Sequence, residues 1–224
     1  MLNVGVLFRN NEALVQPFFY FLRRATGIPI RVIALDNASE DRTGEEINKQ
    51  LDFNNGDIKL ITSENIGISR ARNRIVKFLK GETGKYQDLC LLDSDVFICV
   101  EGSLDKMYSM LKVDKKIGMT FGDTFAFNDF EKRSLGMCFG IIKAEIFEKL
   151  GIFDEQFWCW YDDTDLMHKA RLLNYELKVI PEAKAIHAWG STLSYGSEGK
   201  FRAERIEEDR QRFNKKWNVD IGRS

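Results

Sequence analysis

The chain has 224 residues, 44% of them hydrophobic, and its 33 basic and 34 acidic side chains leave a formal net charge of -1. This length and composition suit one well-buried core, so we expect a single domain. The balanced charge carries no electrostatic footprint for nucleic acid or for an anionic membrane surface, and neither partner is indicated. No apolar run approaches the ~20 residues that a membrane-spanning helix needs, so we expect any membrane contact to be peripheral.

The amino terminus and the cysteines bear on the compartment. Residues 1–8 are apolar but have neither a basic leader nor a small-residue cleavage site, so they predict a first strand rather than a signal peptide. The cysteines form no Cys-x-x-Cys pair and most have apolar neighbours; they are Cys90, Cys99, Cys138 and Cys159. Reduced core thiols are therefore favoured over a zinc site or disulfides, which in turn favours a cytoplasmic protein.

The first hundred residues alternate strand-like with helix-like segments. The predicted strands are residues 4–8, 30–35, 58–62 and 89–92, and the predicted helices lie near residues 12–24, 43–51 and 69–80. This order predicts a doubly wound, mostly parallel α/β sheet. Ligands bind such sheets at the carboxyl ends of the strands. Asp36 and Asp93 each follow an apolar strand directly, so we expect both acids at that edge.

The second half of the chain is more mixed and more aromatic. It predicts a helix near residues 103–112, a strand at 117–121, a polar loop, an apolar stretch at 136–142, a helix from the acidic cluster to about residue 173, and a short strand at 177–180 before Pro181. The glycines and small polar residues of 189–199 predict a flexible loop and a candidate lid. The charged segment from residue 198 to 217 predicts a helix that docks through Phe201, Ile206, Phe213 and Trp217.

The most informative local feature is the apolar run that ends in Asp93-Ser94-Asp95. Alternation along an extended chain puts Asp93 and Asp95 on the same side. Two carboxylates so close repel each other unless a hard cation or a basic group lies between them, and Mg²⁺ or Mn²⁺ carrying a phosphate would meet that need. The structural alternative is a strand end closed by turn-forming residues.

Several further segments make the chain resemble the family 2 glycosyltransferases, which have the GT-A fold, from about residue 4 to residue 193. The matching segments are Leu-Asp-Asn-Ala-Ser-Glu-Asp-Arg-Thr (35–43), Asn-Ile-Gly (65–67), Ala-Arg-Asn (71–73), Leu-Asp-Ser-Asp (92–95), Gly-Ile-Phe-Asp-Glu-Gln-Phe (151–157), Tyr-Asp-Asp-Thr-Asp-Leu (161–166), and Pro-Glu-Ala (181–183) followed by His187. Each segment alone is a weak signal, but their order and spacing together are strong. The resemblance implies a nucleotide-sugar donor, commonly UDP-linked, lying across the carboxyl edge of the sheet.

The resemblance implies roles for the residues that would bind the donor. Asp36 would accept a hydrogen bond from the base, with a turn or helix cap as its structural alternative. Arg72 would face the diphosphate, unless it is a solvated helix charge. The remaining donor-binding residues implied are Phe8, Arg9, Asn37, Asn65, Gly67, Asn73, Asp93 and Ser94.

The resemblance also implies a metal site. Asp95 would bind Mn²⁺ or Mg²⁺ directly, Asp93 would contact the metal, the ribose or both, and His187 would be a further ligand. The metal would neutralise charge on the departing nucleoside diphosphate.

On the acceptor side, a carboxylate must take the proton of the attacking hydroxyl, and the resemblance implies Asp163, or else Asp162, for this role, with inversion at the sugar. An acidic helix N-terminus is the structural alternative for these acids. Trp158 and Trp160 would form a platform for the acceptor, although a buried core position is nearly as well supported for either. In this view residues 1–100 bind the donor, residues 101–197 carry the acceptor and catalytic half, and residues 198–224 form a carboxyl-terminal helix.

The chain departs from the family pattern in ways that leave alternatives open. The first strand ends in Leu7-Phe8-Arg9-Asn10, which weakens the inference of a UDP-linked donor, and no Gln-x-x-Arg-Trp signature of processive synthases occurs, which favours a single sugar transfer. One rival is a haloacid dehalogenase-type phosphatase with Asp93 as nucleophile. A nucleotidyltransferase and a non-catalytic nucleotide-sugar-binding protein are the others. The acceptor, which would carry a hydroxyl, and the oligomeric state remain open.

Overall fold

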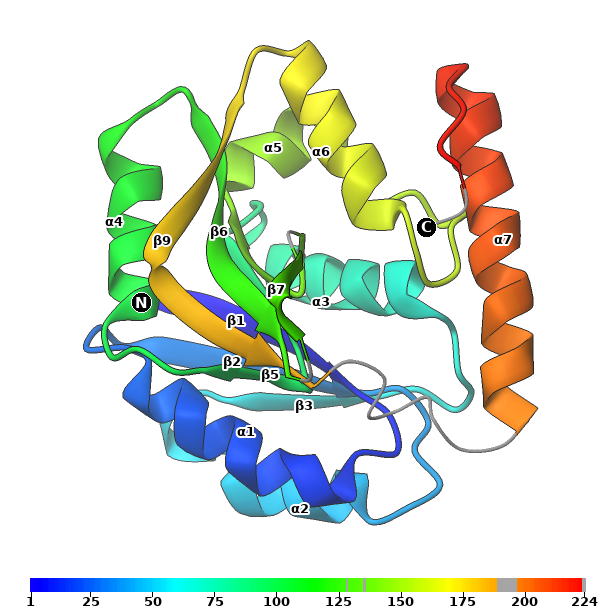
Figure 1. The fold of residues 1–224 in the computed structure, drawn as a ribbon. Coiled ribbons are helices and arrows are strands. Elements are labelled where there is room, and N and C mark those ends of the chain that lie inside the picture. The colour runs from blue at the N-terminus through cyan, green and yellow to red at the C-terminus, as the bar shows by residue number, and fades with distance from the viewer. Residues whose placement is uncertain (128, 135, 189–196, 223–224) are drawn as a thin grey trace.

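The computed structural model describes residues 1–127, 129–134, 136–188 and 197–222. Within them, one nine-stranded sheet is flanked by helices on both faces, and the carboxyl-terminal helix α7 (Ser197–Trp217) stands beside the sheet rather than on it (Figure 1). This is the α/β architecture that the alternation of strand and helix patterns predicts. Among the described helices, none has the length and apolar character that crossing a bilayer requires.

The first half of the chain forms the parallel part of the sheet. Its strands are β1 (Leu2–Phe8), β2 (Ile30–Asp36), β3 (Ile58–Ile61) and β4 (Leu89–Asp93), connected by α1 (Glu12–Arg24), α2 (Thr43–Gln50), a 3₁₀ turn (Phe53–Asn55) and α3 (Ile68–Thr83). They pair in the order β3-β2-β1-β4, all parallel. Apolar residues fill all of β4 up to its final aspartate, because a strand covered by helices on both faces has no solvent side. The predicted strands and helices of this half are confirmed.

The second half extends the same sheet with mixed pairing. It contains β5 (Val96–Ile98), α4 (Ser103–Val113), β6 (Ile117–Ala126), β7 (Asp129–Ser134), β8 (Phe139–Ile142), α5 (Ala144–Leu150), α6 (Asp162–Leu172) and β9 (Glu176–His187). The sheet continues from β4 through β8, β6 and β9 to β5, and β7 pairs with the outer end of β6. Strand β9 runs parallel to β6 but antiparallel to β5, so its last residues lie beside the start of β5.

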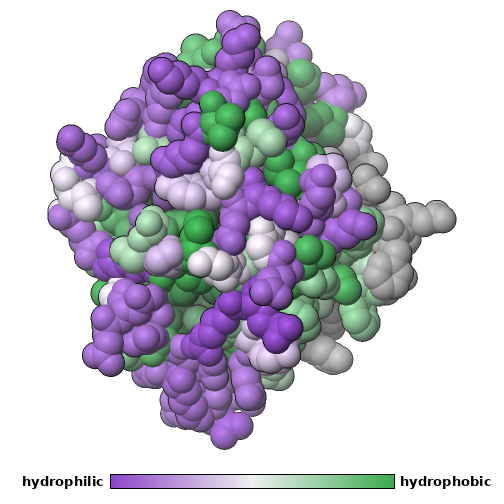
Figure 2. All heavy atoms as spheres, turned by 90° about the vertical axis from the view of Figure 1, so that its left-hand side faces the viewer, coloured by the Kyte–Doolittle hydropathy of each residue, from purple (hydrophilic) through white to green (hydrophobic). Residues whose placement is uncertain are grey.

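Two hydrophobic layers sandwich the sheet. Helices α1, α2 and α4 cover one face, where Phe8 packs between Phe18 and Phe19 at ring-centroid distances of 5.5 and 6.1 Å. Helices α3, α5 and α6 cover the other face. Burying a side chain such as these stabilises the fold by roughly 1.5–3 kcal/mol. The side of the molecule that carries α4 is mainly hydrophilic, with scattered apolar residues between, as on an ordinary solvent-facing surface (Figure 2).

The structure corrects two predictions for the second half, and a third falls mostly outside the described residues. The predicted strand at 177–180 is present but longer than expected, because β9 begins at Glu176 and continues through Pro181 to His187. The β6 register passes from Gly122 opposite Ile180 to Asp123 opposite Lys184, so residues 181–183 bulge and the missing N–H of proline interrupts no ladder. The predicted polar loop after residue 121 is instead the end of β6 followed by β7. Most of the predicted lid, residues 189–196, lies outside the described residues, and the helix it precedes begins at Ser197.

Candidate active site

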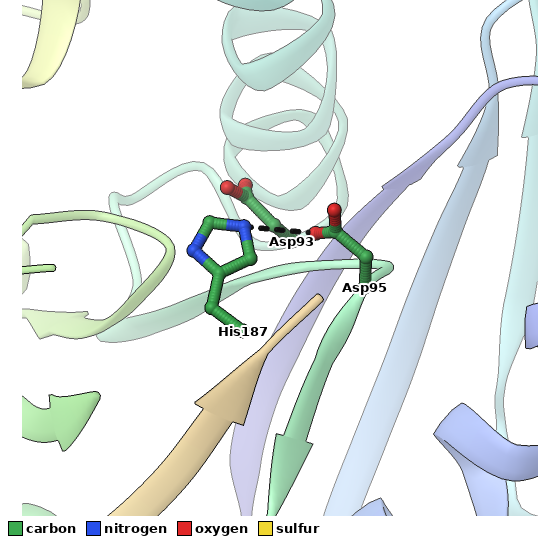
Figure 3. A group of neighbouring side chains, drawn as sticks. All are labelled: Asp93, Asp95 and His187. Atoms are coloured by element: carbon green, nitrogen blue, oxygen red, sulfur yellow. Dashed lines mark ion pairs between the residues drawn. The ribbon is translucent and has the colours of Figure 1, made fainter. Parts of the chain in front are cut away.

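Two aspartates and a histidine meet at the carboxyl edge of the sheet, and we call Asp93, Asp95 and His187 the metal cluster (Figure 3). Each offers one ligand atom, and these atoms all lie within 4.8 Å of one another. His187 reaches the two acids because Val96 and His187 are paired in the β5–β9 ladder and Ala188 N donates to Asp95 O at 2.9 Å. Sheet pairing therefore brings together residues that are distant in the sequence.

The two aspartates are not on one extended strand, as the alternation argument assumed. Asp93 is the last residue of β4, whereas Asp95 lies in the turn that leads into β5. The turn nevertheless brings both carboxylates to the same place, so the predicted proximity is correct although its stated cause is wrong. Ser94, between them, is buried, and its Oγ lies 3.3 Å from Oδ1 of Asn11.

The imidazole of His187 is in contact with Asp95, with Nε2 at 3.1 Å from Oδ1. Burial alone would lower the pKa of His187, but its hydrogen bonds with Asp95 and Cys138 outweigh that effect and raise the pKa to about 10. A protonated His187 offsets the negative charge of Asp95 at this contact. Two carboxylate oxygens and an imidazole nitrogen also fit Mn²⁺, and Mg²⁺ less closely, because Mg²⁺ prefers oxygen ligands.

Arg72, on α3, is a buried bridge between the metal cluster and the acidic segment, by which we mean residues 158–165. Its guanidinium donates to Asp162 Oδ2 at 3.0 Å and lies 3.5 Å from Asp93 Oδ1. Burial would lower the pKa of Arg72, but Asp162 and Asp93 together raise it, so the side chain stays charged. The alternative of a solvated helix charge is therefore wrong for Arg72. Its guanidinium is directed at two carboxylates of the chain itself.

The two predicted bases differ in accessibility. Asp162 is 1% exposed, and burial raises its pKa even though Arg72 opposes the shift. Asp163 is half-buried; its Oδ2 accepts from Met137 N at 3.1 Å and its Oδ1 from Thr164 N at 2.6 Å. Of the two acids, only Asp163 has solvent access, and the N-terminal turn of α6 holds it in place.

The donor-side residues of the sequence prediction lie around the ends of β1, β2 and β3. Asp36 Oδ1 accepts from Ser39 N at 2.9 Å, which is the turn cap that the alternative reading expected. The side chain of Asn37 holds the loop before α3, accepting from Ile66 N at 3.1 Å and donating to Asn65 at 3.0 Å. Arg9 donates to the carbonyls of Asn37 and Ala38. These contacts hold together the loops that follow β1, β2 and β3 at this edge of the sheet.

Burial and contacts of the other predicted site residues bear on their roles. The side chain of Phe8 is fully buried in the core, which argues against a nucleotide contact through its ring. The side-chain amide of Asn73 pairs with the backbone of Phe153, donating at 2.8 Å and accepting at 2.9 Å. It thereby fixes the chain a few residues before the acidic segment. A Cβ at Gly67 would lie 2.7 Å from the carbonyl oxygen of Trp158 and 2.9 Å from its ring. Trp158 is thus packed against the start of α3, whereas Trp160 is 36% exposed.

Sequence reasoning missed two residues that organise the site. Asn11 is buried beside Ser94, and its Oδ1 also accepts from Arg9 N at 3.0 Å; its position just after β1, at the carboxyl edge, was a usable signal. Asp209, on α7, is fully buried and binds the backbone of the acidic segment. No sequence signal marked it, because it is one of many charges in a charged helix.

Comparison with known families identifies the class to which this fold and site belong. The family model "Glycosyl transferase family 2" matches residues 4–180, which is most of the chain. The chain therefore belongs to glycosyl transferase family 2, and the resemblance seen in the sequence is confirmed. A search of curated proteins finds no match.

Solved structures with the same fold are glycosyltransferases of low sequence identity. A mannosyltransferase from Pyrobaculum calidifontis in complex with GDP-Man and Mn²⁺ has a TM-score of 0.73 at 16% identity, covering 99% of this chain and 65% of its own. GalNAc-T7 with UDP, GalNAc and Mn²⁺ has a TM-score of 0.68 at 16% identity, covering 84% and 43%. TarS 1-349 from S. aureus with UDP-GlcNAc has a TM-score of 0.66 at 16% identity, covering 99% and 68%. At this identity the likeness establishes the GT-A fold, and the chain spans less than two thirds of the first two proteins.

Proposed function

We propose that the protein is a metal-dependent glycosyltransferase that moves one sugar from a nucleotide-sugar, with a UDP-linked donor first among candidates, to an acceptor hydroxyl with inversion. The observation that carries the proposal is the buried chain of contacts from the metal cluster through Arg72 to the acidic segment. It joins a cation site for a diphosphate to carboxylates suited to take a proton, at the edge where such sheets bind ligands. Residues 1–100 would form the donor half and residues 101–197 the acceptor half.

The metal cluster would hold Mn²⁺ or Mg²⁺ through Asp93, Asp95 and His187. When bound, the ion supplies a positive charge that stabilises the departing nucleoside diphosphate. Because His187 carries a proton in the ion-free site, it would have to release that proton to become a ligand. The mannosyltransferase and GalNAc-T7 structures both contain Mn²⁺, which supports manganese as the first ion to test.

Asp163 would act as the general base. It has solvent access, and its carboxylate is held by Met137 N and Thr164 N, so it can face an incoming hydroxyl without rearranging. Asp162 would set the charge beside it through Arg72 and is the second choice, because it is buried and already ion-paired. Trp160, which is exposed beside these acids in the sequence, would offer its ring to the acceptor.

A thermal-shift panel tests the proposal. UDP-, GDP- and dTDP-sugars are added to the protein with and without Mn²⁺, because a ligand that binds only the folded state raises the melting temperature. The expected result is a shift for at least one donor that requires Mn²⁺, followed by release of the matching nucleoside diphosphate. If no donor shifts the midpoint in the presence of metal, the proposal fails. A shift without turnover in any acceptor mixture would favour a nucleotide-sugar-binding protein instead.

A further inference from the structure

Asp209 makes an unusual set of contacts for an acidic residue in a surface helix. It lies on α7, outside the residues that the family model matches, and its side chain is 0% exposed. Its carboxylate accepts from three consecutive backbone amides, at 2.9 Å from Trp158 N, 2.9 Å from Cys159 N and 3.2 Å from Trp160 N. A charged acceptor on several backbone amides is a strong, directional arrangement, because each bond is charge-assisted.

The contacts around Asp209 lock α7 onto the acidic segment at further points. Asp165, fully buried, accepts from Trp217 Nε1 at 2.9 Å and pairs with Lys216 at 2.7 Å. The ring of Phe213 packs at 5.3 Å from that of Tyr161. The predicted docking roles of Phe213 and Trp217 are thereby confirmed, whereas the side chain of Phe201 lies outside the described residues.

The segment that Asp209 holds is the one that delivers the proposed base. Tyr161 has a φ of 67°, a left-handed conformation that costs a non-glycine residue energy and persists only when neighbours enforce it. Helix α6 begins at the next residue, so Asp162 and Asp163 lie in its first turn. On its other side the segment is tied to α3, since Trp158 O accepts from Ile68 N at 2.7 Å. Asp209 thus grips the three residues immediately before the strained turn.

We infer that Asp209 is a positioning residue, whose carboxylate holds the backbone of residues 158–160 so that the strained turn at Tyr161 aims Asp163 at the acceptor. This inference rests on the proposed function, and it adds that turnover depends on a helix beyond the family-matched region. Among the described residues, Asp209 bonds to the backbone of residues 158–160 and to Arg212 and not to the metal cluster, so it should govern turnover and leave donor binding alone.

The test compares Asp209→Asn and Asp209→Ala with Glu204→Gln, a matched control at an exposed acid of the same helix. Turnover is followed as release of UDP from UDP-GlcNAc and of GDP from GDP-mannose with Mn²⁺. Water stands in for the acceptor: its oxygen bonds to the anomeric carbon, the bond from that carbon to the diphosphate breaks, and Asp163 takes the proton. Misplacement of a catalytic group by about 1 Å costs about 100-fold in rate, so we expect kcat to fall by about that factor in Asp209→Asn and further in Asp209→Ala. The KM for donor and the Mn²⁺-dependent thermal shift should stay at wild-type values.

A second measurement separates this inference from the proposed function. Hydrogen exchange should quicken at amides 158–160 in Asp209→Asn and remain slow in Glu204→Gln, since exchange reports local opening. If the wild type hydrolyses neither donor, the hydrogen-exchange data alone decide the inference about Asp209, and the donor thermal-shift panel decides the proposed activity. Unchanged exchange, unchanged kcat, or an equal loss of donor binding would each overturn the inference. If neither variant folds, hydrogen exchange of the wild type decides the inference. The amides of residues 158–160 should then exchange no faster than those of α7, and faster exchange would overturn the inference.

Discussion

The metal cluster and the acidic segment are joined through Arg72 but are held in place by different means. Asp93, Asp95 and His187 end or adjoin strands, so ladder pairing places them. The acidic segment lies in a loop and the first turn of a helix, and it owes its position to side-chain contacts from α3 and α7. The metal cluster should therefore tolerate changes elsewhere in the chain, whereas the position of the acidic segment should depend on residues distant from it in the sequence.

The largest expected effect comes from removing a ligand of the metal cluster. Asp95→Ala should abolish the Mn²⁺-dependent part of the donor-induced thermal shift and lower turnover by at least about 1,000-fold, because the metal supplies several kcal/mol of charge stabilisation. Glu101→Ala, at an exposed acid beyond β5, serves as the control. A metal-dependent shift that survives in Asp95→Ala would disprove the metal assignment.

Changing the proposed base, in the first turn of α6, should separate donor binding from turnover. We expect Asp163→Asn to lower kcat by about 100-fold or more, since a general base contributes at least that factor, while donor binding with Mn²⁺ is retained. Asp162→Asn should instead weaken the fold as well, because Asp162 is the buried partner of Arg72. Full activity in Asp163→Asn would remove this residue from the mechanism.

Breaking the bridge between the two regions should cost stability. Arg72→Met leaves the buried Asp162 without its ion-pair partner and should lower the free energy of unfolding by about 3–5 kcal/mol in urea titrations. Combining it with Asp162→Asn should recover part of that loss, because no buried charge is then left unpaired at that position. Arg74→Met, at an exposed arginine of the same helix, is the control, and an equal effect from it would contradict the bridge.

The smallest effect concerns the metal-free cluster and its pH dependence. The pKa of His187 is raised from 6.5 to about 10 in the folded protein, so its stabilising contribution is complete below pH 6.5 and is lost as the pH rises toward 10. In chelator, the melting temperature of the wild type should therefore decline relative to that of His187→Gln across this range. If the melting temperatures of the two proteins change with pH in parallel, the contact with Asp95 does not keep His187 protonated.

Much of the first half of the fold was readable from local pattern. The apolar runs and the helix periods of the first hundred residues predict β1 to β4 in their parallel arrangement, and the acids that end two of those strands indicate the working edge. The predictions fail where the pairing of distant strands overrides a local signal. Pro181 reads as a strand end, yet a bulge against β6 absorbs it, and Phe8 reads as an edge residue, yet α1 buries it.

The sequence by itself determined the family, the α/β architecture and the residue types of the site, because periodicity and short motifs are local properties of the chain. Only the tertiary structure decided which of those residues act on one another. Arg72 and Asp162 are 90 residues apart and Trp158 and Asp209 are 51 apart, so neither pairing has a local signature. The partner of a buried charge is chosen by where the fold brings a matching group, and burial then makes that choice costly to change.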